Sequence, residues 1–338
     1  VFGIIIAVHE LGHFILAKMN KIGVTEFSIG MGPTIWSFQK KETKYSLRLF
    51  PIGGFCLMLG DGEDSEAENA FPNKSVWARM LVIAAGPLFN FILAFVFSVV
   101  LISFVGYDAP KIDTVNKDSS AYEAGIKKGD VITGIGNEQI KVYREVLVFM
   151  QFHQEEKPIN LTVERDGKEI SFVVTPKLNE EYGIYQIGII GGYREDGNIF
   201  TTVKYSVYEV RYWIKTTIVS LKQLVTGHVK MKNLAGPVGI GKMMSDTIDE
   251  ADEAGGTIDV VLNVINFCIL LSANLGVMNL LPIPALDGGR FLFLIIEAVR
   301  RKRVSINVET VVNVVGFVLI MLLMVFVMFN DVKNVFFK

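Results

Sequence analysis

The stretch HELGH, residues 9–13, holds two histidines and a glutamate whose spacing suits metal chemistry. His9 and His13 are four residues apart, so a helix would carry both imidazoles on one face, with Glu10 next to the first. Zinc hydrolases use this spacing: two histidines bind the metal, and the glutamate takes a proton from the attacking water. The alternative is a pair of helix histidines satisfied by neighbouring backbone or carboxylate groups. Because ionisable groups are costly inside an apolar run such as 1–17, the metal interpretation is favoured.

A catalytic zinc site takes a third protein ligand and leaves one position open. The other two histidines, His153 and His228, fall in a segment predicted to lie outside the membrane, so we expect a carboxylate. Glu26 lies in a β-like run, and Glu297 lies beyond a further helix start. Asp287 is the better candidate, because it ends NLLPIPALDGGR, where two prolines must interrupt a helix and two glycines let the backbone turn. Taken alone, Asp287 could instead be a helix cap.

Four apolar runs are long enough, or nearly so, to cross a bilayer. In a chain of 338 residues that is 51% hydrophobic, they lie at about 1–17, 80–105, 260–281 and 308–329. The chain starts with Val rather than Met, so we expect the first span to be longer than this sequence shows. Lysine and arginine are concentrated after the first span and in RRKR at 300–303, which predicts that these loops face the cytoplasm. The long 106–257 segment would then lie outside.

Charge and turn signals divide the chain into four parts. They are 1–106 with two spans and a β-like loop, 107–190 as an α+β domain, 191–257 as an amphipathic linker region, and 258–338 with two further spans. The loop is punctuated by glycine, and because exposed strand edges cannot sit in lipid, it must stay in water or be enclosed by protein. Its free edge would suit an extended substrate. The run IFTTVKYSVYEVRYWIKTTIVSLKQLV predicts an amphipathic helix at the membrane surface.

Within the α+β part, SSAYEAGIKKGDVITGIGNEQI resembles the central signature of a PDZ domain. That resemblance implies a module that binds an extended peptide or a C-terminus by strand addition. The alternative is a β-domain that only spaces or gates the membrane part.

HELGH together with NLLPIPALDGG is similar to the paired motifs HExxH and NxxPxPxLDG of the site-2 protease family of intramembrane zinc metalloproteases. Both match at every defined position, and FSIGMGP, AAGPLFN and NLAGPVGI resemble the bacterial branch elsewhere in the chain. The resemblance implies a multi-pass α-helical membrane protein of about four transmembrane helices, with a membrane-associated β-loop and an inserted extracytoplasmic PDZ-like α+β domain. It implies zinc ligation by His9, His13 and Asp287, with Glu10 as general base. The residues that it implies face the substrate are Asn279, Pro282 and Pro284.

Asn90, early in the second span, is a further substrate-binding candidate. Its amide could lie near a developing oxyanion, although Gly86 and Asn90 could instead only allow close helix packing.

The expected protein is a zinc-dependent intramembrane endopeptidase of a bacterial inner (plasma) membrane. Its partners would be the lipid bilayer and single-span membrane proteins such as an anti-sigma factor or a signal-peptide remnant, which would unwind and add as a strand near Tyr45–Phe55. A net charge of −2 gives no reason to expect nucleic acid. One alternative is a non-catalytic scaffold with a structural metal, against which the presence of Glu10 argues. Another is a metal transporter, which would need more polar residues than the second and fourth spans offer.

Overall fold

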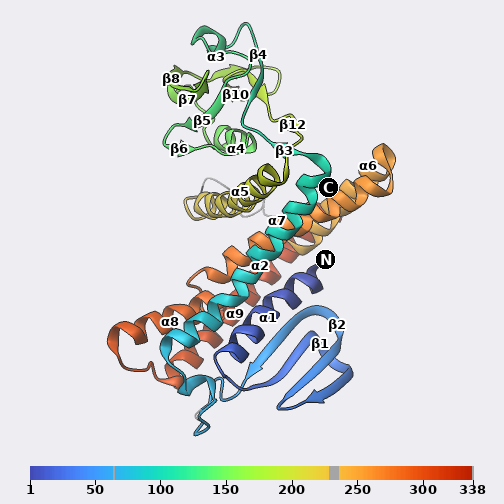
Figure 1. The fold of residues 1–338 in the computed structure, drawn as a ribbon, viewed down its shortest axis with the longest axis vertical. Helices are drawn as coiled ribbons and strands as arrows, with labels where there is room; N and C mark the ends of the chain where they lie inside the picture. The colour runs from blue at the N-terminus through green and yellow to red at the C-terminus, as the bar shows by residue number, and fades with distance from the viewer. Residues whose placement is uncertain (64, 228–235, 337–338) are drawn as a thin grey trace. The chain divides into compact units, whose positions relative to one another are not determined.

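The computed structural model describes residues 1–63, 65–227 and 236–336 (Figure 1). These residues form two compact units, one made of 1–97 with 217–338 and the other of 98–216. His228 and the first three residues of NLAGPVGI lie outside the described residues.

The described residues include four helices that are long and apolar enough to cross a membrane, and all or most of each lies in the first unit. They are α1 (Phe2–Met19), α2 (Val76–Val105), α7 (Thr257–Leu280) and α9 (Ile306–Phe336). The four expected spans are thus confirmed, with ends that differ by a few residues. Only 6% of the most apolar window of α9 is buried inside the protein, so most of its valine, leucine and phenylalanine side chains need a lipid environment.

Two further helices of this unit are too polar or too short to be spans. Helix α8 (Asp287–Arg300) follows α7 after a six-residue irregular segment, and it is amphipathic with Leu294 buried. Helix α6 (Pro237–Gly255) is polar on most of its surface. Its first turn is capped from α9, because the Gly239 N–H donates to the buried Asp331 carboxylate at 2.6 Å.

A long hairpin, β1 (Val24–Lys40) and β2 (Thr43–Met58), follows α1. The two strands fold back on themselves, so residues 26–29 pair with 54–57 on one side and with 44–47 on the other. Residues 34–40 pair with 43–48. The stretch 44–47 is therefore paired on both sides, whereas 54–57 pairs with β1 along one side only. A short 3-10 helix, Phe71–Asn73, precedes α2.

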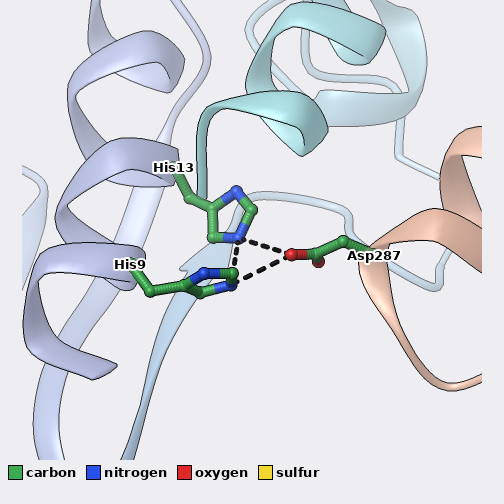
Figure 2. A group of neighbouring side chains, drawn as sticks. All are labelled: His9, His13 and Asp287. Atoms are coloured by element: carbon green, nitrogen blue, oxygen red, sulfur yellow. Dashed lines mark hydrogen bonds and ion pairs between the residues drawn. The ribbon is translucent and has the colours of Figure 1, made fainter. Parts of the chain in front are cut away.

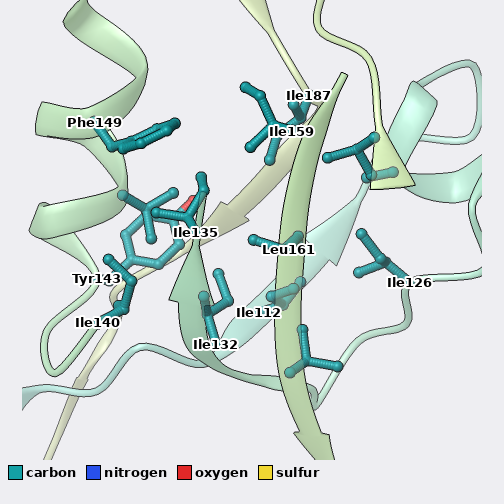
Figure 3. Packing of buried hydrophobic residues seen from close by; sticks show 14 residues of the cluster. Ile112, Ile126, Ile132, Ile135, Ile140, Tyr143, Phe149, Ile159, Leu161 and Ile187 are labelled. Carbon is teal, nitrogen blue, oxygen red and sulfur yellow. The ribbon is translucent and has the colours of Figure 1, made fainter. Parts of the chain in front are cut away.

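The second unit is an α+β domain, built on a four-stranded sheet in the order β6-β5-β7-β8. Its elements are β3 (Tyr107–Asp108), β4 (Ile112–Val115), α3 (Ser120–Glu123), β5 (Val131–Ile135), β6 (Glu138–Gln139), α4 (Arg144–Phe152), β7 (Ile159–Arg165), β8 (Lys168–Val174), β9 (Lys177–Asn179), β10 (Ile184–Gln186), β11 (Ile189–Gly191) and β12 (Arg194–Glu195). The DG pair between β7 and β8 has positive φ at both residues, as a tight hairpin turn requires. Figure 3 shows the core, where isoleucine, leucine and aromatic side chains converge between α4 and the strands.

Helix α5 (Ile199–Val225) begins in this second unit and packs its charged side chains against the α+β domain. Arg211 and Lys215 form ion pairs with Glu145 and Glu138 at 2.6 and 2.7 Å. Ile199, Phe200 and Val203 in its first two turns are exposed, and the expected location at a membrane surface stays a prediction.

A buried ion cluster ties α5 to the start of the domain. The Arg144 guanidinium donates to Asp108 at 2.9 Å and also to Glu209. Burial alone would lower the pKa of Arg144, but these two carboxylates hold it above its usual value. The part of the helix up to residue 216 therefore belongs to this unit.

Candidate metal centre

Three predicted ligands converge inside the helical unit (Figure 2). His9 and His13 lie on successive turns of α1, and Asp287 is the first residue of α8. The Asp287 Oδ2 atom lies 3.0 Å from His9 Nε2 and 3.3 Å from His13 Nε2, and the two Nε2 atoms are 3.2 Å apart. Both histidines are 6% exposed. The fold thus brings together residues from opposite ends of the chain.

The chemistry of this cluster fits a divalent metal ion. Asp287 Oδ2 is buried and makes no well-formed hydrogen bond in the described structure, although two imidazole nitrogens lie beside it. Three lone-pair donors pointing at one another are satisfied by a cation placed among them. Two histidine nitrogens and one carboxylate oxygen form a donor set that zinc prefers in catalytic sites.

The far side of each imidazole also has a partner. His13 Nδ1 lies 2.8 Å from the carbonyl oxygen of Val82 in α2, so its N–H donates there and Nε2 is left free. His9 Nδ1 lies 3.1 Å from the side-chain amide of Asn90. In the structure the amide nitrogen faces His9, and the buried amide oxygen has no hydrogen-bond partner among the described residues. Rotating it by 180° satisfies the oxygen and makes His9 Nε2 a free ligand atom.

Asn90 therefore lies behind the His9 ring. It is fully buried, and its backbone carbonyl accepts a hydrogen bond from Ser272 in α7 at 2.8 Å. This differs from the substrate-binding role expected for Asn90, because an amide held against a histidine nitrogen is not available to an oxyanion. The geometry favours Asn90 as a residue that orients a metal ligand.

We expect Asn90→Leu to lower zinc affinity about 10- to 100-fold, because a histidine ligand then loses its outer hydrogen bond. Asn90→Asp keeps an acceptor facing His9 Nδ1 and should bind zinc within a few-fold of the wild type. Competition with a chromophoric chelator in detergent measures both variants. Wild-type affinity in Asn90→Leu, or equal loss in the two variants, would contradict this assignment.

Gly86 gives the imidazoles their space, whereas the sequence suggested only close helix packing for this residue. A Cβ atom at Gly86 would lie 2.4 Å from His13 Nε2 and 2.7 Å from His9 Cε1. Gly12 plays the packing role instead, since a Cβ there would lie 2.5 Å from the carbonyl oxygen of Ala85. The close approach of α1 and α2 thus depends on two glycines with different neighbours.

Gly86→Ala is expected to displace both imidazoles and weaken zinc binding by at least about 10-fold, because overpacking costs about 1–3 kcal/mol. Gly241→Ala in α6 is the matched control, as no atom lies within 4 Å of a Cβ there. The same chelator competition gives the result. Unchanged zinc binding in Gly86→Ala would show that the imidazoles are not held where Figure 2 draws them.

Glu10 lies on α1 beside the cluster but is not part of it. Its side chain points toward β2: a Cβ at Gly54 would lie 3.3 Å from Glu10 Cγ, and the Cys56 backbone N–H hydrogen-bonds to the carboxylate. Glu10 is thus located between the metal ligands and residues 54–57, the stretch of β2 that pairs with β1 along one side only. A carboxylate in this position can take a proton from water and pass it on to a group lying along that strand.

The predicted substrate-facing residues lie at the end of α7, which contains Asn279, and in the irregular segment before α8, which contains Pro282 and Pro284. Asn279 and Pro284 are half-buried, and Pro282 is exposed. The segment is pressed against α9, since a Cβ at Gly316 would lie 2.4 Å from Pro284 Cβ. The Ala285 N–H donates to Asn313 of α9 at 3.2 Å. These contacts set the path of the chain into Asp287.

The two glycines after Asp287 act differently from the sequence expectation. They lie within the first turn of α8, and the left-handed residue of the turn is Ala285, with φ of 72°. A Cβ at Gly288 would lie 2.1 Å from the Leu281 carbonyl oxygen, and one at Gly289 would lie 2.4 Å from that of Ile283. The glycines therefore permit close approach of backbone to backbone instead of forming the turn.

The rejected carboxylates have other partners. Glu26 accepts hydrogen bonds from Ser46 at 2.7 Å and Arg48 at 2.9 Å. Glu297 is paired with Arg79. Neither belongs to the metal cluster found among the described residues. The contact from Val82 is not predictable from the sequence, because a backbone carbonyl leaves no signature there. The motif GPLFN indicates Asn90 as a candidate but not that its amide faces a histidine.

A helix-borne HExxH pair completed by a distant carboxylate, within apolar helices, defines a metalloprotease of the membrane. The family model described as Peptidase family M50 matches residues 1–323. Zinc metalloprotease RasP of Geobacillus kaustophilus is 32% identical over 99% of this chain and 97% of its own length. The Regulator of sigma-W protease RasP of Bacillus subtilis is likewise 32% identical, over 99% and 97% of the two chains.

The α+β domain has weaker structural matches. The PDZ domain of an SdrC-like protein from Listeria monocytogenes is 21% identical, covers 26% of this chain and 90% of that chain, and has a TM-score of 0.23.

The chain belongs to peptidase family M50 and is a zinc metalloendopeptidase of the site-2 protease type. It is a multi-pass membrane protein with an α+β domain inserted between its second and third spans.

Proposed function

We propose that this protein cuts single-span membrane proteins within or near their membrane segments, with His9, His13 and Asp287 as zinc ligands and Glu10 as general base. The observation that carries the proposal is the convergence of the three ligand atoms beside Glu10 in an apolar helix bundle. The relative named Regulator of sigma-W protease supports an anti-sigma factor as one substrate class. A signal-peptide remnant offers the same chemistry, a single apolar segment.

Bound zinc would act as a Lewis acid that polarises the scissile carbonyl and lowers the pKa of water toward about 7. His9, His13 and Asp287 would hold it, while Val82 and Asn90 keep the imidazoles in the ligating tautomer. Glu10 accepts a proton from the attacking water as the new C–O bond forms. It then donates that proton to the leaving amine as the C–N bond breaks, so no further reactant is needed.

The test is cleavage of a tagged single-span reporter protein by the purified full-length chain in detergent. Removing metal with a chelator should abolish cleavage, and adding Zn²⁺ back should restore it. A variant with one ligand removed, His13→Ala, should neither bind zinc nor cleave the reporter. Zinc-independent cleavage, or a wild type that binds no zinc, would overturn the proposal.

We infer that the substrate unwinds and adds as a strand along residues 54–57. A helical substrate hides its carbonyl groups in its own hydrogen bonds, and strand addition exposes them. Support comes from the pairing of 54–57 with β1 along one side only and from the location of the Glu10 side chain beside Gly54. Ser46 is a worse site than the sequence suggested, because it pairs with Ser28 on one side and Ser37 on the other.

Disulfide trapping tests whether the substrate lies along residues 54–57 or along residues 44–47. In a Glu10→Gln background with both native cysteines changed to serine, Leu57→Cys is paired with substrates carrying one cysteine at successive positions. Leu47→Cys is the matched control, since Leu47 and Leu57 are 45% and 47% exposed. We expect cross-links to Leu57→Cys at every second substrate position. A repeat of three to four positions would indicate a substrate that stays helical, and preference for Leu47→Cys would place it elsewhere.

We propose that the PDZ-like domain lies outside the cytoplasm and gates substrates by size. Its likeness to peptide-binding domains allows capture of a C-terminus, but two contacts favour gating. Both the N–H and the C=O of Tyr185 in β10 are taken by the Gln154 side chain, at 2.8 and 3.3 Å. The Tyr143 hydroxyl donates to the Ile189 carbonyl of β11 at 3.2 Å. These side chains occupy backbone groups that an added strand would need.

The gate is tested by deletion. Strands β3 and β12 pair through Asp108 and Arg194, so replacing 109–193 with a short glycine-serine linker joins ends that already lie together. We expect this variant to cleave reporters that still carry a large outer domain, which the full chain rejects. Unchanged selectivity would count against gating. An impermeant thiol reagent, applied to intact cells bearing Lys168→Cys, tests whether the domain lies outside.

A further inference from the structure

Helix α8 supplies the third ligand, and something must fix its position. It begins at Asp287 and is joined to α7 only by the irregular segment 281–286, so no continuous helix sets its depth or rotation. A shift of one helical turn would move Asp287 by about 5.4 Å and separate it from the two histidines. The contacts on the rest of α8 therefore decide whether the metal site is assembled.

The first contact lies one turn beyond the ligand. Arg290 donates to the carboxylate of Asp61, which lies in the turn after β2. The two side chains are 28% and 19% exposed. The Arg290 guanidinium also stacks over the Phe71 ring, 5.5 Å from its centroid. This contact links α8 to the hairpin side of the unit.

The second contact lies two turns further along. Glu297 accepts two hydrogen bonds from the Arg79 guanidinium, one of them 3.1 Å between Nη1 and Oε2. Arg79 is 8% exposed at its side chain and also donates to the Lys74 carbonyl at 3.2 Å. This pair links α8 to the first turn of α2, the helix that supplies Val82, Gly86 and Asn90.

The two pairs have opposite polarity. Arg290 and Glu297 are seven residues apart, so they lie on nearly the same face of α8, about 10 Å from each other. Along α8, the positive Arg290 comes first and pairs with Asp61. The negative Glu297 follows and pairs with Arg79. Sliding or rotating α8 would break both pairs and leave partly buried charges unmatched, which disfavours any other register.

We propose that Asp61 and Arg79 are positioning residues, which hold α8 in the one register that brings Asp287 to His9 and His13. Both ion pairs line one cavity of about 370 Å³. The inference rests on the proposed zinc ligation. A specifying role of this kind is the best-attested use of buried ion pairs.

The experiment measures the affinity of the purified full-length chain for Zn²⁺ alone, by chelator competition in detergent. Arg79→Glu and Glu297→Arg should each lower the affinity about 10- to 100-fold. The double variant, which reverses the pair, should recover to within about three-fold of the wild type. Lys18→Glu is the matched control, because it breaks the exposed Lys18–Glu42 pair, which includes no residue of α8.

Glu297→Gln provides a milder test should a charge reversal fail to fold, and a several-fold loss is expected there. Full zinc affinity in the single variants, or no recovery in the double variant, would overturn the positioning role. Failure of the zinc site itself gives a different pattern, in which His13→Ala also leaves zinc binding unchanged. A merely structural pair would change the melting temperature of the metal-free protein without this reciprocal effect on zinc.

Discussion

Replacing Glu10 with glutamine should lower peptide-bond cleavage by about 10²- to 10⁴-fold while zinc stays bound. The amide is nearly the same size as the carboxylate but cannot accept the proton from water, and a positioned general base contributes about that factor. Glu10 is not among the three converging ligands, so its loss should leave metal affinity within a few-fold of the wild type. The residue thus separates catalysis from metal binding.

The measurement combines single-turnover cleavage of the single-span reporter with zinc content of the same preparation. Glu42→Gln is the control, since it removes an exposed carboxylate of the hairpin that pairs with Lys18. Cleavage at the wild-type rate in Glu10→Gln would remove Glu10 from the mechanism. Loss of zinc together with cleavage would instead make Glu10 a ligand, which the described geometry does not show.

Changing Asp287 to asparagine should lower zinc affinity by more than about 100-fold and abolish cleavage. An asparagine fills the same space and supports the start of a helix as well as aspartate does, but it lacks the charge that makes a strong zinc ligand. If Asp287 were only a helix cap, this variant would bind zinc like the wild type. The substitution therefore decides directly between the two interpretations of this residue.

Zinc content and chelator competition again give the result, with Asp118→Asn, an exposed aspartate of the α+β domain, as the control. Helix content measured by circular dichroism should be the same in both variants. Wild-type zinc affinity in Asp287→Asn would show that the third ligand lies elsewhere. The Arg79–Glu297 pair would then have no ligand to position.

Several features of this protein follow from the sequence alone. The four spans are predicted because their length and apolar composition leave no other stable environment. The HELGH spacing predicts two imidazoles on one helix face, since a helix repeats every 3.6 residues. Pro282 and Pro284 predict the end of α7, which the structure places at Leu280. These features are local: each depends on residues within one or two helical turns, or on one continuous run.

Only the tertiary structure decided how distant parts meet. No sequence pattern shows that β1 pairs with two parts of β2, or that residues 54–57, beside Glu10, are paired along one side only. Gly288 and Gly289 suggested a turn, yet their neighbours are carbonyl groups that approach too closely for any side chain. Asn90 suggested an oxyanion contact, but its amide faces His9. The register of α8 depends on ion pairs with residues more than two hundred positions away, which is a property of packing and not of local sequence.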